Sequence, residues 1–128
     1  MIYLDTSVAL AELFAEDRRP ADALWREPLI SSRLLEYELW TRVNARGAGA
    51  THGEAVREIL ARVSLVELAP AALARALETF PLPVRTLDAL HLATFHFLAS
   101  RRQRVTLATY DERMRGCAQK LGIELAVM

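Results

Sequence analysis

Four acidic residues lie beside or inside apolar segments, where solvent-exposed acids are uncommon: Asp5, Glu38, Asp88 and Asp111. Asp5 ends the apolar run of residues 2–4, and Asp111 follows the largely apolar segment 105–110. A carboxylate in apolar surroundings is unfavourable unless its charge is compensated. A divalent cation shared by the four acids would provide this compensation, and carboxylate-bound hard cations are widely used to hydrolyse phosphodiesters. The acids therefore predict a metal site with phosphodiesterase chemistry.

The elements that must position these acids alternate along the chain. Apolar runs and turn residues predict short strands at residues 2–5, 29–31, 65–68, 105–109 and 123–127. Between them the pattern predicts helices at residues 6–15, 20–27, 32–47, 51–62, 71–79, 86–100 and 111–121. This alternation predicts an α/β fold with an open, mostly parallel sheet covered on both faces.

In such a sheet, ligands bind at the carboxyl ends of the strands, near a switch in strand order. Asp5 and Asp111 both follow predicted strands, so we expect them to converge on one edge. Glu38 and Asp88 must reach that edge from helices. Asp88 falls in the first turn of its helix if Thr86 is the N-cap.

The bulk composition limits the class of protein. The 128 residues are 52% hydrophobic and 25% charged with zero net charge, which predicts one globular domain over residues 1–128. A neutral chain is unlike a nonspecific nucleic-acid coat protein. No apolar run approaches the roughly 20 residues of a membrane span. A single cysteine, Cys117, and the lack of a basic leader favour a cytoplasmic, reducing setting.

Four motifs in order carry a family resemblance: YLDTS at 3–7, SRLLEYEL at 32–39, DALHLA at 88–93 and TYDERM at 109–114. Together they resemble the PIN-domain ribonucleases, and in length and motif order the VapC-type toxins of toxin–antitoxin pairs. The resemblance covers essentially the whole chain. It implies a three-layer α/β/α fold with a five-stranded, mostly parallel sheet. It also implies an endoribonuclease that depends on Mg²⁺ or Mn²⁺.

The resemblance implies a role for particular residues. Asp5, Glu38, Asp88 and Asp111 match the acids that hold the metal and are catalytic. Thr6, Ser7 and Thr109 match the hydroxyl positions that accompany them. On this hypothesis the metal activates a water, held by Glu38, for in-line attack on an RNA phosphodiester. The implied partners are an RNA substrate, a cognate antitoxin protein and a second copy of the chain.

A second glutamate, Glu36, competes with Glu38 for the second acidic position. On a helix the two side chains point about 200° apart, so only one of them can face the site. The distance from Ser32 favours Glu38, by the same resemblance.

Several basic and histidine residues have two readings. Arg42 and Arg46 follow Glu38 along one helix face and either bind phosphate or form ion pairs and contact solvent. The basic turn 101–104 is either a solvated loop or a contact to the RNA backbone. His91 shares a helix face with Asp88, so it either orients that carboxylate, contacts substrate, or is a hydrogen-bonded core residue.

The resemblance also implies an antitoxin segment in an apolar groove near the first helices. Four residues either form such a groove or, as is usual for apolar side chains, pack in the core: Phe14, Leu24, Trp25 and Trp40. Phe95 and Phe97 belong to an apolar helix and are assigned to the core or to a homodimer surface. The alternative function is a non-catalytic module of the same fold that acts in a complex with antitoxin or DNA. A phosphoaspartyl phosphatase fits poorly, because it needs a second Asp two residues after Asp5, where this chain has Ser7. A receiver domain fits poorly, because it needs a Lys after a late strand, and the single lysine, Lys120, lies in a predicted helix.

Overall fold

The computed structural model describes residues 1–101 and 104–128. Its sheet has four strands: β1 (Ile2–Leu4), β2 (Leu29–Ser32), β3 (Val63–Val66) and β4 (Thr106–Ala108). The strand order is β3-β2-β1-β4 and every pairing is parallel. The chain therefore moves from β1 to one side through β2 and β3, and β4 returns on the other side. This places the switch in strand order beside β1.

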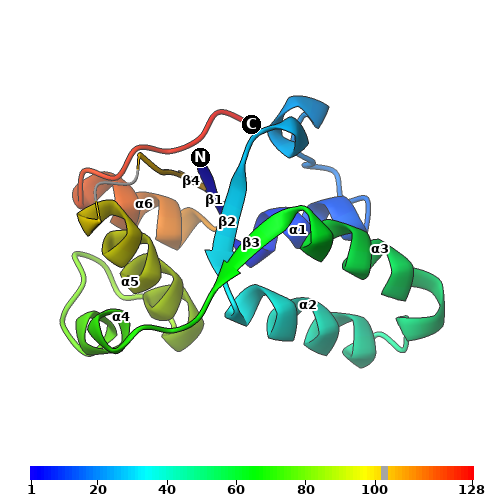
Figure 1. Ribbon diagram of the computed structural model, residues 1–128, viewed down its shortest axis with the longest axis horizontal. Coiled ribbons are helices and arrows are strands. Elements are labelled where there is room, and N and C mark those ends of the chain that lie inside the picture. Colours follow the sequence, from blue (N-terminus) through cyan, green and yellow to red (C-terminus); the bar gives the residue numbers. More distant parts are fainter. Residues whose placement is uncertain (102–103) are drawn as a thin grey trace.

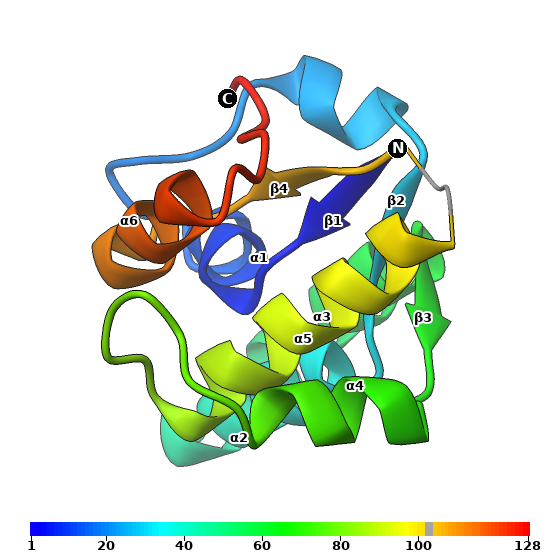
Figure 2. The same ribbon diagram turned by 90° about the vertical axis from the view of Figure 1, so that its left-hand side faces the viewer.

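Seven helices connect or flank the strands in the described part of the chain (Figure 1). Their bounds are α1 (Thr6–Leu13), the 3₁₀ helix η1 (Asp22–Arg26), α2 (Leu34–Ala45), α3 (Gly49–Ala61), α4 (Pro70–Ala76), α5 (Thr86–Ser100) and α6 (Glu112–Lys120). α1, α2 and α3 lie on one side of the sheet, and α4, α5 and α6 on the other (Figure 1). In Figure 2, α4 runs alongside α5.

Neighbouring residues of each strand enter two different cores, because side chains alternate between the faces of a sheet. Leu4 packs with residues of α1, α2 and α3, whereas Tyr3 packs with residues of α5 and α6. Leu107 and Ala108 of β4 divide in the same way. Both faces of the sheet are thus buried, as is usual for parallel sheets. The three-layer arrangement follows from this alternation.

The prediction of a fifth strand at residues 123–127 is wrong. This segment forms one isolated parallel bridge, between Leu125 and Leu107. The Leu107 N–H donates to the Glu124 carbonyl at 2.9 Å, and its carbonyl accepts from the Ala126 N–H at 2.8 Å. β4 has three residues. The peptide groups of Thr106 and Ala108 form hydrogen bonds toward β1, so Leu107 is the residue of β4 whose peptide groups face a partner on the outer edge. Residues 123–127 therefore pair with β4 through a single bridge rather than as a fifth strand.

Several predicted helix ends also differ from the structure. α3 begins at Gly49 rather than at residue 51, and the hydroxyl of Thr51 donates to the Ala48 carbonyl at 3.2 Å. Gly47 ends the preceding turn with φ of 62°, a left-handed conformation that glycine adopts without strain. The segment predicted as a helix at 20–27 forms only the tighter 3₁₀ helix η1. Such ends depend on local capping geometry rather than on apolar periodicity.

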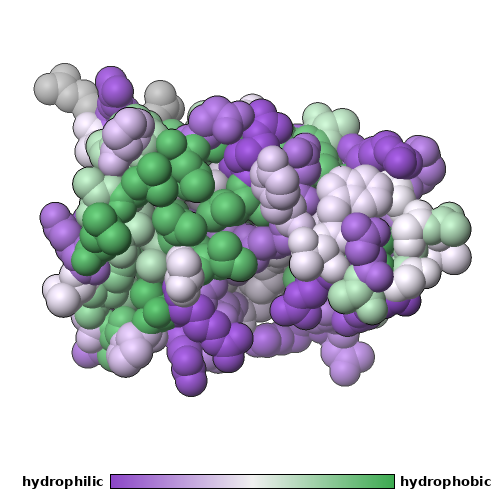
Figure 3. Space-filling model, turned by 90° about the horizontal axis from the view of Figure 1, so that it is seen from below, coloured by the Kyte–Doolittle hydropathy of each residue, from purple (hydrophilic) through white to green (hydrophobic). Residues whose placement is uncertain are grey.

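One apolar surface stands out on the space-filling view, over the half of the molecule that holds α4 and α5 (Figure 3). A groove of about 990 Å³ runs between α4, the segment that follows it and the start of α5. Leu77, at the end of α4, is 90% exposed. Within residues 1–101 and 104–128, no helix combines the length and apolar character needed to cross a membrane.

Candidate active site

Asp5 is the residue at which β1 ends and α1 begins. It is the N-cap of α1, and its side chain is 4% exposed. One carboxylate oxygen, Oδ2, accepts hydrogen bonds from the Ser7 hydroxyl at 2.6 Å, the Thr109 hydroxyl at 2.8 Å and the Ser7 N–H at 3.3 Å. Hydrogen bonds of this kind fix the orientation of a buried carboxylate. The strand end thus fixes one oxygen of Asp5 inside the fold.

Asp111 occupies the equivalent position after β4, as the N-cap of α6. Its Oδ1 accepts from the Met114 N–H at 2.9 Å. Two hydroxyls join this strand end to that of β1: Thr109 Oγ1 accepts from the Asp111 N–H at 3.1 Å, and Ser7 Oγ accepts from the Tyr110 N–H at 2.9 Å. Ser7 and Thr109 therefore hold the two strand ends, and with them the two acids, in register.

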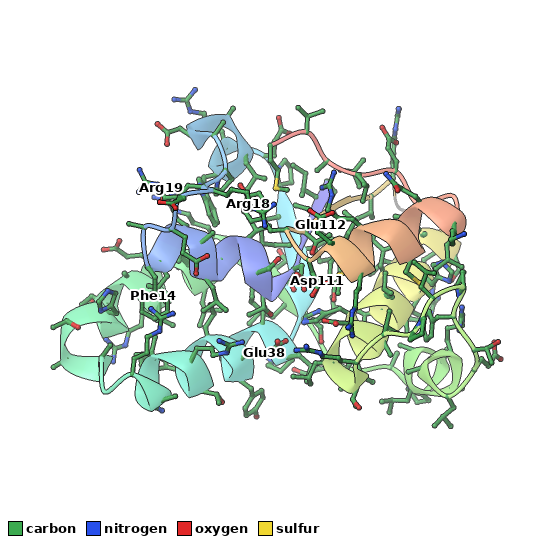
Figure 4. The ribbon with its side chains drawn as sticks, turned by 180° about the vertical axis from the view of Figure 1, so that it is seen from behind. Phe14, Arg18, Arg19, Glu38, Asp111 and Glu112 are labelled. Atoms are coloured by element: carbon green, nitrogen blue, oxygen red, sulfur yellow. The ribbon has the colours of Figure 1, made fainter. Side chains whose placement is uncertain are left out.

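A cleft of about 570 Å³ lies at this edge of the sheet. Its walls include all four acids singled out from the sequence, together with Thr6, Ser7, Leu10, Leu34, Tyr37, Thr41, Arg42, Arg85, Thr86 and Leu87. The acids come from four different elements: the ends of β1 and β4, the middle of α2 and the first turn of α5. Figure 4 shows Glu38 and Asp111 facing the same space between α2 and α6.

Glu36 does not line this cleft. Its carboxylate lies 3.7 Å from the guanidinium of Arg33, the residue that precedes α2. Glu38, on the opposite side of the helix, is the acid that faces the cleft.

The crowding of carboxylates changes the protonation of Asp88. Burial, together with repulsion by Asp111, Asp5 and Glu38, raises the pKa of Asp88 to about 6, although His91 opposes the shift. Acids so close to one another are stable in their charged form only when a cation or a proton relieves them. The donor set is all carboxylate and hydroxyl oxygen, which suits a hard divalent cation.

Within the described residues, no three His, Cys, Asp or Glu side chains are close enough together to bind one metal ion directly. Mg²⁺ retains several waters and takes one or two carboxylates directly. An open cleft with acids on separate walls fits such a hydrated ion. The residues present therefore fit the metal that the family resemblance implies.

The profile of the PIN domain matches residues 2–120, which is most of the chain. The chain belongs to the PIN-domain family. Ribonuclease VapC46 of Mycobacterium tuberculosis is 37% identical over 127 residues, covering 95% of this chain and 93% of that protein. Ribonuclease VapC35 of the same organism is 33% identical over 129 residues, covering 96% and 93%.

Two solved structures have the same fold as this PIN domain. One is VapBC2 from Rickettsia felis, bound to a DNA fragment from the VapBC2 promoter. Its TM-score is 0.71 at 17% identity, with 98% of each chain covered. The other is a toxin–antitoxin complex from Klebsiella pneumoniae, with a TM-score of 0.65, 19% identity, and 91% of this chain and 92% of that chain covered.

His91 contacts a different acid of this PIN domain from the one its spacing suggested. Its Nε2 lies 2.6 Å from Glu38 Oε1, although it shares a helix with Asp88. The side chain is 1% exposed, so it is also a core residue. Burial alone would lower the pKa of His91, but the hydrogen bond to Glu38 and the charges of Asp5, Glu38 and Asp88 raise it overall.

The arginines near the cleft separate into two groups. Arg42 lines the cleft, as does Arg85, which sequence reasoning missed because no pattern distinguishes it from other surface arginines. Arg46 does not line it, because its guanidinium stacks on the Phe14 ring at 3.9 Å. Arg102 and Gln103 of the predicted basic turn lie outside the described residues.

The four residues considered for an antitoxin groove lie in different surroundings. Leu24 is a core residue and 4% exposed. Trp25 lines a small pocket of about 170 Å³ with residues of α1 and α3, whereas Trp40 lies against Gly53 and Arg57. On the other side of the sheet, Phe95 is buried in the second core and Phe97 packs against that core.

Proposed function

We propose that this PIN-domain protein is a metal-dependent endoribonuclease, the toxin of a type II toxin–antitoxin pair. The observation that carries the proposal is the convergence of Asp5, Glu38, Asp88 and Asp111 from four elements on one cleft. The two VapC relatives, which carry the name ribonuclease and match nearly the whole chain, support the same activity.

The metal is Mg²⁺ or Mn²⁺, held by Asp5, Asp88 and Asp111 with Glu38 completing the site. When bound, such an ion supplies activation of water and neutralisation of phosphoryl charge. Thr6 also lines the cleft, with its hydroxyl 3.4 Å from His91 Nε2. Ser7 and Thr109 orient Asp5 by donating to its Oδ2. These contacts therefore orient Asp5 before any metal binds.

The substrate is RNA, and Arg42 and Arg85 are the residues that contact its phosphates. Both arginines line the acidic cleft, where a polyanion must pass close to the metal. Arginine binds phosphate through two parallel hydrogen bonds.

Replacing Arg42 or Arg85 with alanine is expected to raise KM about tenfold each and to leave kcat nearly unchanged, because a charge-assisted bond to substrate is lost while the acids stay in place. Steady-state cleavage of a short RNA at several salt concentrations measures this, and the salt dependence of KM should become shallower. Arg57→Ala is the matched control, since Arg57 pairs with Glu54 on α3. A wild-type KM in both cleft variants would remove the arginines from the substrate site.

The partners are a cognate antitoxin protein and a second copy of the chain, in the cytoplasm. The two structures with this fold are described as toxin–antitoxin complexes, which supports an antitoxin partner. The homodimer rests on the family resemblance, and light scattering of the purified protein tests it.

The deciding experiment is incubation of total RNA with purified protein and Mn²⁺ or Mg²⁺, with and without EDTA. Discrete fragments that disappear with EDTA are expected, and their mapped ends identify the target. If no fragment appears with any metal, and calorimetry detects no Mn²⁺ binding, the non-catalytic module replaces the nuclease. Mn²⁺ binding without fragments would place the target RNA outside the pool.

A further inference from the structure

A buried chain of hydrogen bonds leads from the core to one acid of the cleft. The Ser32 N–H donates to Tyr3 Oη at 3.2 Å, Tyr3 Oη lies 2.8 Å from His91 Nδ1, and His91 Nε2 lies 2.6 Å from Glu38 Oε1. Tyr3 is 0% exposed and His91 1%, whereas the Glu38 side chain is 21% exposed. The chain therefore begins in the dry interior and ends at the cleft.

The direction of the bonds follows from the groups involved. A peptide N–H only donates, so the Tyr3 oxygen accepts from Ser32 and keeps its own proton for another partner. Burial raises the pKa of Tyr3 above its ordinary value of 10, so the phenol stays protonated. A neutral His91 that accepts this proton at Nδ1 must carry its own on Nε2. A doubly protonated ring also donates from Nε2, so Glu38 receives a hydrogen bond in either state.

Glu38 depends on this bond more than the aspartates depend on any one of theirs. Asp5 and Asp111 are short side chains at helix N-caps, where backbone N–H groups hold them. Glu38 has a longer side chain in the middle of α2, and in the described part of the chain its hydrogen-bond partner is His91. A free glutamate side chain has substantial rotamer entropy, which a single short bond from a rigid donor removes.

The chain of hydrogen bonds from Tyr3 to Glu38 also connects the two sides of the sheet. Glu38 is on α2, on one side of the sheet, and His91 is on α5, on the other side, with its ring between Glu38 and Tyr3 of β1. Asp88 is on the same face of α5 as His91, three residues earlier. Fixing Glu38 against His91 therefore also fixes its position relative to Asp88.

We propose that His91, oriented by Tyr3, is a positioning residue that holds the Glu38 carboxylate in place for the metal. This inference rests on the proposed function, because it gives Glu38 a role at the metal. It assigns a task to two buried residues that do not touch the metal or the substrate.

Three variants separate positioning from simple packing. His91→Leu keeps an apolar volume and removes the donor, His91→Gln places an amide N–H near the Nε2 position, and Tyr3→Phe removes only the hydroxyl. His96→Leu is the matched control, since His96 lies on α5 near Arg75 and outside the cleft. Calorimetry of Mn²⁺ binding at one pH, with thermal unfolding to verify folding, is the measurement.

We expect His91→Leu to weaken Mn²⁺ binding at least tenfold, Tyr3→Phe to weaken it less, and His91→Gln to remain within about threefold of wild type, as is found for residues that orient metal ligands. His96→Leu should bind as wild type does. Equal losses in His91→Leu and His91→Gln that follow their losses in thermal stability would overturn the positioning role. So would wild-type binding by a folded His91→Leu.

A second readout needs no activity and no metal. Long-range ¹H–¹⁵N NMR of the His91 ring in the wild-type protein should show a proton on Nε2, with a resonance that moves in Glu38→Gln. An Nε2 without a proton would contradict the proposed hydrogen bond from His91 to Glu38. If the wild type binds no Mn²⁺ at all, the proposed function fails, and the NMR result decides the hydrogen-bond chain separately.

Discussion

Replacing Asp5 with asparagine is expected to lower metal-dependent RNA cleavage at least 100-fold, more than the loss of a residue that only orients a ligand. The reason lies in the three donors that converge on Oδ2, two of them hydroxyls and one a backbone N–H. These donors require an acceptor, so they select the carbonyl oxygen of the asparagine. Its NH₂ group must then occupy the position of Oδ1. A donor would thus replace the oxygen that is left for the cation.

The same substitution should leave the fold intact. Asparagine caps helices about as well as aspartate, so α1 keeps its N-terminal hydrogen bond. Asp22→Asn is a suitable control, because Asp22 is exposed on η1 and outside the cleft. Cleavage assays with Mn²⁺, together with thermal unfolding, make the test. Metal-dependent cleavage at the wild-type rate by Asp5→Asn would show that the assignment of Asp5 is wrong.

The positions of Asp5 and Asp111 were predictable because they depend on chain order alone. Each follows a short apolar run, and the carboxyl ends of parallel strands meet at one edge. Asp88 was predictable from the first turn of its helix, even though Arg85 rather than Thr86 is the N-cap. In each case, one element and its end determine where the side chain points.

Contacts between distant elements were not predictable in this way. Helical spacing offers Asp88 as one neighbour of His91, but the carboxylate that the ring contacts is Glu38, 53 residues away on α2. Arg42 and Arg46 share a helix face, yet the Phe14 ring lies against Arg46, while Arg42 is left at the cleft. Periodicity defines the face of a helix, whereas the neighbouring elements decide which residues on that face meet a partner.

The missing fifth strand has a similar cause. Residues 123–127 have the apolar composition of a strand, but a strand needs a partner with free peptide groups. β4 is three residues long, so its outer edge accommodates one bridge. The length of the neighbouring strand, rather than the local sequence, determines the outcome.

The raised pKa of Asp88 predicts opposite effects of pH on metal binding and on the stability of the metal-free protein. Mn²⁺ requires the carboxylate, and with a pKa of about 6 the acid is mostly protonated at pH 5. Mn²⁺ affinity should therefore fall about tenfold between pH 7 and pH 5. Asp88→Asn should bind Mn²⁺ far more weakly and lose this dependence. Calorimetry at the two pH values is the measurement.

The stability effect has the reverse sign. In the unfolded chain this carboxyl has its ordinary pKa of 3.8, so the folded protein binds the proton more tightly. Its contribution to stability is complete below that value and is lost as pH rises through about 6. In EDTA, Asp88→Asn should therefore unfold at a higher temperature than wild type at pH 7, and the difference should vanish near pH 4.

Adding Mn²⁺ at pH 7 should raise the unfolding temperature of the wild type but not of Asp88→Asn, because the cation compensates the buried, repelled charge that the substitution removes. The comparison reports Asp88 together with its effect on His91, because the charge of Asp88 contributes to the raised pKa of that ring. If Asp88→Asn is less stable than wild type at pH 7 in EDTA, the carboxylates are not in conflict. The cleft would then hold its acids without need of a cation, and the main physical argument for the metal would be lost.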